Sequence, residues 1–253
     1  MIYTVINNKG GSGKSSICFN VLSSISQKFT LIEIDNNNNT SQIYKDSIVL
    51  KNNSVKSVKL NDAEAAFDEA IFRSLDGESR DIIIDSGGGD DTLHVVKLLL
   101  ENTNYDDCIF LIPLLQSRAQ LQNAIDTYKL VQDRKVVFVL NGADKKEDFV
   151  FWFGSTEYDV PSVDPILLNM PTFFLPKTPL FDLSALSGEV LIDAAQMAFL
   201  YDNNKQAQED IAKIADGDFA EYRRILGRYR VSVQAKKYIE DNFKYLENIL
   251  ETI

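Results

Sequence analysis

Short apolar runs alternate with longer segments of helical periodicity along most of this chain. The runs cover residues 2–6, 29–35, 82–85, 108–113, 135–141 and 172–176. The run 136–140 (VVFVL) is apolar at every position, which is typical of strands that helices cover on both faces. This alternation predicts an α/β fold with a doubly wound, mostly parallel sheet.

The segments between these runs predict further local structure. Residues 62–75 and 117–131 carry apolar side chains at helical spacing and are expected to form helices. Residues 48–60 alternate weakly, and we expect an edge hairpin there. Pro113 is expected to end its strand. His94, the only histidine, stands in an apolar stretch and is expected to pack rather than catalyse.

Beyond about residue 188 the pattern is helical to the end, with Gly217 and Gly227 as expected breaks. The last helix, from about Val231 to Ile253, carries an amphipathic stripe that could dock on the core, pair with a second subunit or lie on a membrane. Its acidic residues disfavour an anionic membrane, so docking is expected. We predict a core over residues 1–200 and a C-terminal helical extension over 201–253 that packs on it.

Composition narrows the partners and the compartment. The chain has 253 residues, 45% of them hydrophobic, and a formal net charge of −11, which opposes uniform binding to nucleic acid. Cys18 and Cys108 lack the spacing of a metal site and are expected to be buried, reduced thiols. The chain opens on a core strand rather than a secretory signal, and no apolar run approaches the roughly 20 residues of a spanning helix. A cytoplasmic location is expected.

Residues 8–16 (NKGGSGKSS) lie between the first apolar run and an amphipathic segment. Glycines allow backbone N–H groups to surround phosphate oxygens, and the helix that follows presents its positive N-terminal end. Lys14 can reach the β and γ phosphates of a nucleotide, and the Ser15 hydroxyl can ligate Mg²⁺. The loop predicts a nucleoside triphosphate site made of Gly10, Gly11, Ser12, Gly13, Lys14, Ser15 and Ser16.

Two polar residues at strand ends extend this predicted site, because ligands of parallel sheets bind beyond the carboxyl ends of the strands. Asp85 ends an apolar run and precedes the glycines 87–89. Its carboxylate can hold Mg²⁺ through a water shell, or simply cap a turn. Asn141 follows the run 136–140 and offers both a donor and an acceptor to an adenine edge, while an Asn-Gly turn is the rival interpretation.

The run 9–15 (KGGSGKS) resembles the deviant P-loop of the ParA/MinD family of ATPases, with Asn8 in place of the first glycine of the ordinary pattern. This resemblance implies a homodimer with ATP or ADP and Mg²⁺ at its interface, in which Lys9 acts on the partner's nucleotide and Lys14 on its own. It also implies that Asp35 orients the attacking water. Glu33 replaces the family's first aspartate, and asparagines at 36–37 replace its Pro-Gln.

Region 221–237 concentrates basic residues. It holds six of them against Glu221 alone, which predicts contact with phosphate backbones, although a solvated helical face is an equal alternative. The resemblance implies non-specific DNA binding by the ATP-bound dimer. The six residues are Arg223, Arg224, Arg228, Arg230, Lys236 and Lys237.

The function that the resemblance implies is a slow ATPase that positions plasmid DNA, in partition or in conjugative transfer. A centromere-bound adaptor protein would stimulate it, and the ATP-bound form would be associated with the nucleoid. A MinD-like membrane-cycling ATPase is one alternative. A metabolic P-loop ligase or kinase is another, against which Lys9 argues. A nucleotide-binding protein with little hydrolysis is the third.

Overall fold

The computed structural model describes residues 1–35, 40–75, 80–102, 105–201 and 203–253. The four asparagines 36–39, two of which stand in place of the Pro-Gln of the family pattern, lie outside this described part. Within it, seven strands form one sheet in the order β3-β2-β4-β1-β5-β6-β7, and every neighbouring pair is parallel. The strands are β1 (Ile2–Val5), β2 (Phe29–Ile34), β3 (Ser54–Val58), β4 (Asp81–Ser86), β5 (Cys108–Leu114), β6 (Lys135–Ala143) and β7 (Thr172–Pro176).

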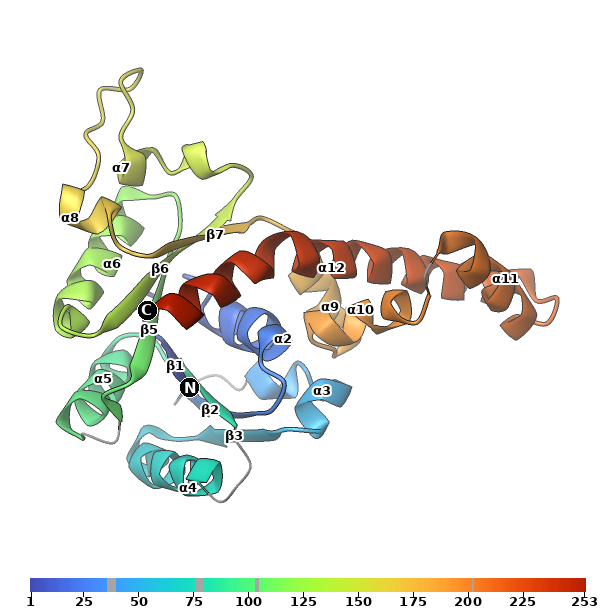
Figure 1. The fold of residues 1–253 in the computed structure, drawn as a ribbon, viewed down its shortest axis with the longest axis horizontal. Helices are drawn as coiled ribbons and strands as arrows, with labels where there is room; N and C mark the ends of the chain where they lie inside the picture. Colours follow the sequence, from blue (N-terminus) through green and yellow to red (C-terminus); the bar gives the residue numbers. More distant parts are fainter. Residues whose placement is uncertain (36–39, 76–79, 103–104, 202) are drawn as a thin grey trace.

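Helices cover both faces of this sheet, as Figure 1 shows. The first face is covered by α4 (Ala63–Leu75), α5 (Asp90–Glu101), α6 (Arg118–Val131), α7 (Val150–Phe153) and α8 (Pro165–Leu168). The second is covered by the continuous helix α1–η1–α2 (Lys14–Ser16, Ile17–Leu22 and Ser23–Ile25), α3 (Ile48–Lys51), α9 (Leu180–Ser187), α10 (Leu191–Phe199) and α12 (Phe219–Thr252). The expected doubly wound α/β fold is therefore confirmed.

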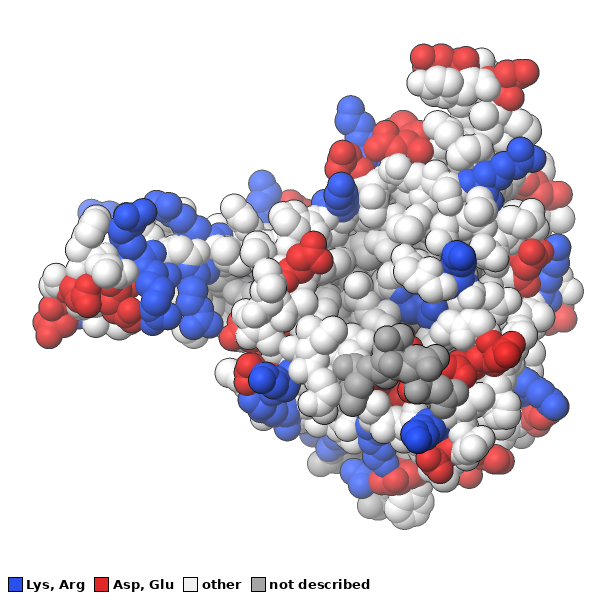
Figure 2. Space-filling view, turned by 180° about the vertical axis from the view of Figure 1, so that it is seen from behind, with Lys and Arg blue, Asp and Glu red and all other residues white. Residues whose placement is uncertain are grey.

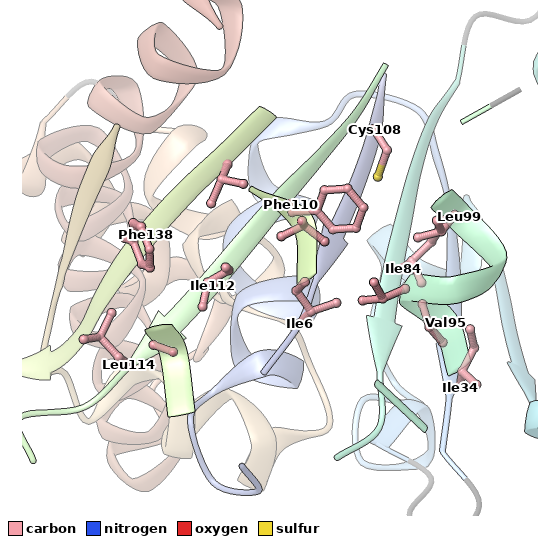
Figure 3. Packing of buried hydrophobic residues seen from close by; sticks show 14 of the residues in the cluster. Ile6, Ile34, Ile84, Val95, Leu99, Cys108, Phe110, Ile112, Leu114 and Phe138 are labelled. Atoms are coloured by element: carbon pink, nitrogen blue, oxygen red, sulfur yellow. The ribbon is translucent and has the colours of Figure 1, made fainter. Parts of the chain in front are cut away.

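The two apolar cores follow from the two-residue period of the strands. In β4, Ile82 and Ile84 face the first core, whereas Ile83 faces the second. Figure 3 shows the first core, where Ile84 lies near Val95 and Leu99 of α5. Because both faces are filled, only the strand ends are left for polar chemistry.

The C-terminal helices extend away from the sheet. The helix α11 (Asn204–Ile214) and residues 219–233 of α12 project together (Figure 1), and we call them the arm. Ala207, Ile211 and Tyr229 form a small apolar cluster inside the arm. Residues 235–250 of α12 instead contribute buried side chains to the second core of the sheet, among them Phe243 and Leu246. The division of the chain at residue 200 stays a prediction.

The edge hairpin predicted for residues 48–60 is wrong. Residues 48–51 form a helical turn whose N-cap, Ser47, accepts a hydrogen bond from Leu50 N at 3.0 Å. This turn allows the chain to cross over, so β3 pairs with β2 in parallel, Thr30 opposite Ser54. The helix predicted over 62–75 is confirmed as α4, and that over 117–131 as α6, with Ser117 as the N-cap.

Three single-residue expectations also need correction. Gly227 lies inside α12 and does not break it, whereas Gly217 does separate α11 from α12, with φ +83°. Pro113 lies within β5, one residue before its end, and pairs in register with Val139. His94 is exposed on α5 rather than packed, because Val95 and Val96 face the core while His94 and Leu93 do not. Cys18 and Cys108 are buried free thiols, as expected.

A search of the described helices finds none that is both long and apolar enough to cross a membrane.

Candidate phosphate-binding site

The glycine loop begins where β1 ends, at the carboxyl edge of the sheet. Asn7 is fully buried there, and its Nδ2 donates to Pro113 O at 2.6 Å. Its Oδ1 accepts the backbone N–H of Lys9 at 2.8 Å. Asn7 thus joins β1 to β5 beyond their last paired residues. The backbone of Pro113 has no N–H there and cannot donate a hydrogen bond to β1. The sequence interpretation missed Asn7, whose only signal was a polar residue at a strand end.

The loop then turns through left-handed backbone. Gly11 has φ +75° and Gly13 has φ +96°, a region that side chains with a Cβ disfavour. The helix α1–η1–α2 begins directly after Gly13 and runs into the second core. Its first N–H groups have no intrahelical carbonyl partners, and its macrodipole is positive at this end. The backbone is thereby shaped to receive an anion.

Lys14 lies inside the loop rather than on the surface. It is 7% exposed, and its Nζ donates to Asn7 O at 3.1 Å and Lys9 O at 3.4 Å. Burial lowers the pKa of Lys14, while the nearby acidic groups Asp85 and Asp35 act to raise it. A desolvated ammonium so placed is a strong partner for a phosphate, since charge-assisted hydrogen bonds strengthen where water is excluded.

Asp85 lies in β4, beside β1, and is 3% exposed. Burial raises its pKa to about 7. A hydrogen bond with Ser15 and the charge of Lys14 oppose that shift, and the carboxylates of Glu33 and Asp35 add to it. The structure therefore brings Ser15, Lys14 and Asp85 together, as the sequence predicted.

Three side-chain oxygens around the loop are buried without a hydrogen-bond partner in the described part of the chain. They belong to Asn8 (Oδ1), Ser12 (Oγ) and Asp85 (Oδ1). Each such group costs about 1–3 kcal/mol unless a ligand or water satisfies it. This concentration at one strand edge fits a bound nucleotide and a hydrated cation.

The donor set also fits Mg²⁺ in particular. Among the described residues, no group of three His, Cys, Asp or Glu side chains could hold a metal without help. Mg²⁺ commonly keeps several waters and takes one or two protein oxygens together with substrate phosphates. Ser15 and Asp85 supply oxygens of this kind.

The glycines after β4 close the other side of the loop. Gly89 N donates to Asn8 O at 2.9 Å, and a Cβ on Gly88 would lie 3.6 Å from Gly10 N. Thr92 Oγ1 lies 3.2 Å from Asn7 O and fixes the start of α5 against the loop. Gly88 and Gly89 are therefore the members of the 87–89 run that lie against the phosphate loop.

Asn141 reaches the loop from β6. Its Nδ2 donates to Ser12 O at 2.9 Å, and a Cβ added to Gly13 would lie 2.1 Å from that nitrogen. Gly142, with φ +82°, allows the strand to bulge at this point. Asn141 therefore braces the glycine loop, and its contact with adenine stays a prediction.

Glu33 is the second functional residue that the sequence interpretation underrated. It is 1% exposed, lies in register with Asp85 across β2 and β4, and accepts the backbone N–H groups of Thr40 and Ser41. Its carboxylate thus fixes the point at which the chain after Asp35 returns to the sheet. A charged residue inside the apolar run 29–34 was the available signal.

A parallel sheet with a glycine loop after β1, a buried lysine in that loop and an acidic residue on the adjacent strand defines the P-loop NTPase class of α/β folds. No family model matches the chain, and no curated protein sequence does.

Solved structures do match it. One is the Cyanothece McdA–ATP complex, 16% identical over 76% of this chain and 89% of that one, with a TM-score of 0.46. Another is the Pyrococcus furiosus cell division ATPase MinD, 16% identical over 74% and 88%, with a TM-score of 0.46. A third is a protein assigned to plasmid partition in Borrelia burgdorferi, bound to AMPPNP, 16% identical over 90% and 97%, with a TM-score of 0.46. The ParA/MinD-type ATPases among these structures belong to the family that the loop motif resembles. With 16% identity and TM-scores of 0.46, the function is argued from the residues described above.

Proposed function

We propose that this chain is a ParA-type ATPase that dimerises on ATP, binds DNA non-specifically and uses hydrolysis to position plasmid DNA. One observation carries the nucleotide part: the buried, partnerless oxygens of Asn8, Ser12 and Asp85 surround a glycine loop that already holds a desolvated Lys14. Buried polar groups of this kind need hydrogen-bond partners, which an anion and its counter-ion, or water in their place, would supply.

Each residue of the loop has one task in this proposal. Backbone N–H groups of residues 10–16 bind the phosphates, and Lys14 neutralises their charge. Ser15 and the Asp85 carboxylate would hold the Mg²⁺ shell, and that ion would supply further neutralisation of charge when bound. Asn141 keeps the loop in shape through Ser12. The glycines after β4, of which Gly88 lies against Gly10, would supply a further backbone N–H to the phosphates.

Lys9 supports the dimer. Its backbone is fixed at both ends, because Lys9 N donates to Asn7 and Lys9 O accepts from Lys14 Nζ, yet the residue is exposed. A lysine held at the mouth of a phosphate site is placed to act on a nucleotide outside its own loop. The family resemblance assigns it to the partner subunit's nucleotide.

Asp35 is the residue we assign to water positioning. It directly follows β2, partly exposed, at the strand edge that carries Asp85. Glu33, two residues before it, accepts the backbone N–H groups of Thr40 and Ser41, where the described chain resumes. Turnover would be slow until an adaptor protein bound at the plasmid's centromere stimulates it. The protein would act in the cytoplasm, on the nucleoid when ATP is bound.

The central experiment measures mass by light scattering after size exclusion, with ADP or ATP and with or without duplex DNA. Wild type should double its mass with ATP alone and bind DNA only in that state. Lys14→Ala should weaken nucleotide binding by about 10- to 150-fold, since a hydrogen bond to a charged group is worth about 1.5–3 kcal/mol. Lys9→Ala should keep ATP affinity and fail to dimerise.

The matched control is Lys97→Ala, which removes an exposed lysine of α5 that pairs only with Glu101. It should behave as wild type throughout. An ATP-dependent dimer that persists in Lys9→Ala would remove the shared-site arrangement. ATP binding without any change of mass would favour a monomeric nucleotide-binding protein, and ATP-dependent vesicle binding would favour the membrane-cycling alternative.

A further inference from the structure

The six basic residues of region 221–237 are not equivalent in the structure. Three of them are committed to partners within the protein. Arg224 donates from Nε and Nη2 to the Glu221 carboxylate at 2.7 and 2.6 Å. Arg228 pairs with Glu189, from the link between α9 and α10, at 3.3 Å. Lys236 donates to Ala198 O at 3.4 Å, with its ammonium 5.0 Å from the ring centroid of Phe199.

These three contacts all stabilise the arm or the part of α12 that joins the arm to the core. The Arg224–Glu221 pair lies within the first turns of α12, and the other two join α12 to segments next to α10. Exposed ion pairs stabilise a fold only weakly. The charges of Arg224 and Arg228 are nevertheless cancelled locally, since each arginine has a carboxylate within 3.5 Å. Lys236 keeps its charge, but its ammonium is held by the Ala198 carbonyl and the Phe199 ring.

The other three basic residues make no ion pair within the described chain and are exposed. They are Arg223, Arg230 and Lys237. Their spacing of seven residues places them on one face of α12, because seven residues complete almost two helical turns. At 1.5 Å per residue they stand about 10 Å apart and span about 21 Å along the helix. No charged residue lies between them near this face, where the intervening positions are Leu226, Gly227, Val233 and Gln234.

Figure 2 shows lysine and arginine side chains gathered over the arm, while acidic side chains gather at its tip. The remainder of the chain must carry a strong negative excess, since the net charge is −11. A polyanion is therefore repelled by the body and attracted to the arm. Inside the arm, Tyr229 and Ile211 are buried and Leu226 and Val233 pack against their cluster, whereas the three cations stay exposed.

We infer that Arg223, Arg230 and Lys237 form the face of α12 that contacts the DNA backbone, whereas Arg224, Arg228 and Lys236 hold α12 and the arm in place. This assignment rests on the proposed function, because it names the contact surface for the DNA binding proposed there. Unpaired cations release counter-ions from DNA when they bind, and cations already neutralised by carboxylates release few.

The test compares two charge-matched triple variants of the full chain. R223Q/R230Q/K237Q removes the unpaired set, and R224Q/R228Q/K236Q removes the paired set, so each lowers the net charge by the same amount. Binding of the ATP-loaded proteins to a fluorescent random-sequence 30-base-pair duplex is measured by anisotropy between 50 and 200 mM salt. Thermal melting and ATP affinity are measured for both variants, so that a loss of fold is detected.

The first variant should reduce the slope of log K against log salt by about 2.7, which is 0.9 for each of three lost phosphate contacts. The ratio of its affinities at 50 and 200 mM salt should then fall by about 40-fold relative to wild type. The second variant should change the slope by less than one while lowering the melting temperature. An equal loss of slope in both variants, or a larger one in the second, overturns the assignment. Absence of ATP-dependent DNA binding in wild type would instead defeat the proposed function itself.

Discussion

The phosphate loop and the arm hold their charged groups in opposite ways. In the loop, Lys14 and Asp85 are buried, and three neighbouring oxygens lack partners in the described structure. In region 221–237, which begins on the arm, the basic residues are mostly exposed, and half of them already have partners. A buried site indicates its ligand through groups that it leaves unsatisfied. An exposed site indicates its ligand only through cations that the fold does not use.

The contrast extends to glycine. Gly13 in the loop is required by its backbone and by the close approach of Asn141, whereas Gly227 in the arm has open space around its Cα. The loop therefore tolerates little change, and the arm should tolerate a good deal. The next three predictions test this difference, from the largest expected effect to the smallest.

The largest effect should come from Asp85→Asn in nucleotide-free protein with EDTA. The folded protein keeps the carboxyl protonated up to a pKa of about 7, whereas the unfolded chain ionises it near pH 4. The stability linked to that proton is full below about pH 4 and is lost as the pH rises through about 7. Asparagine does not ionise, so the variant should gain on the order of 4 kcal/mol relative to wild type between pH 4 and pH 8.

Urea unfolding at several pH values measures this gain. Asp126→Asn is the control, because hydrogen bonds from Lys129 and Gln122 lower the pKa of that exposed carboxyl. Its contribution has the opposite sign and is lost as the pH falls. A stability difference between Asp85→Asn and wild type that stays constant from pH 5 to pH 8 would show that Asp85 ionises normally.

The second effect should come from Gly13→Ala. A Cβ there would lie 2.1 Å from Asn141 Nδ2, at a φ of +96° that alanine adopts only with strain. Displacing Asn141 also breaks its hydrogen bond to Ser12, so we expect a loss of about 2–3 kcal/mol of stability. Gly10→Ala is the control in the same loop, because its added Cβ meets nothing within 4 Å. Equal urea midpoints for the two variants would contradict the bracing role of Asn141.

The smallest effect should come from Gly227→Ala, and it should be a gain. The glycine lies inside α12 with nothing within 4 Å of an added Cβ. Alanine should stabilise the helix by about 0.5–1 kcal/mol and raise the melting temperature by about 1–3 °C. The affinity for DNA should stay unchanged. A fall in melting temperature would mean that α12 needs a flexible point here, as the sequence pattern first suggested.

Local sequence predicted most of the sheet and the centre of the site. Continuous apolar runs marked six strands within a residue or two, because strands covered on both faces must be apolar throughout. The Gly-Lys-Ser turn after β1 marked the phosphate loop, since its backbone conformation and lysine are requirements of neighbouring residues alone. The Ser117 cap of α6 was similarly local.

Contacts between distant residues decided the rest. The parallel pairing of β3 depends on a crossover past α3, whose cap Ser47 is held by Asp193, and a weak alternation over 48–60 cannot show that. Gly227 stays helical because Tyr229 and Ala235, which follow it in α12, are buried against other elements. Such packing outweighs a helix-propensity cost of about 1 kcal/mol.

The order of residues along this chain determined by itself that the fold is α/β, that a phosphate loop follows the first strand and that basic charge concentrates near the C-terminus. Only the tertiary structure decided that Glu33 anchors the chain after Asp35, that Asn141 braces the glycine loop and that Arg223, Arg230 and Lys237 are the unpaired cations of their region. The physical reason is the same in each case: whether a polar group is available to a ligand depends on the partner that the fold brings to it, and those partners lie far away in the sequence.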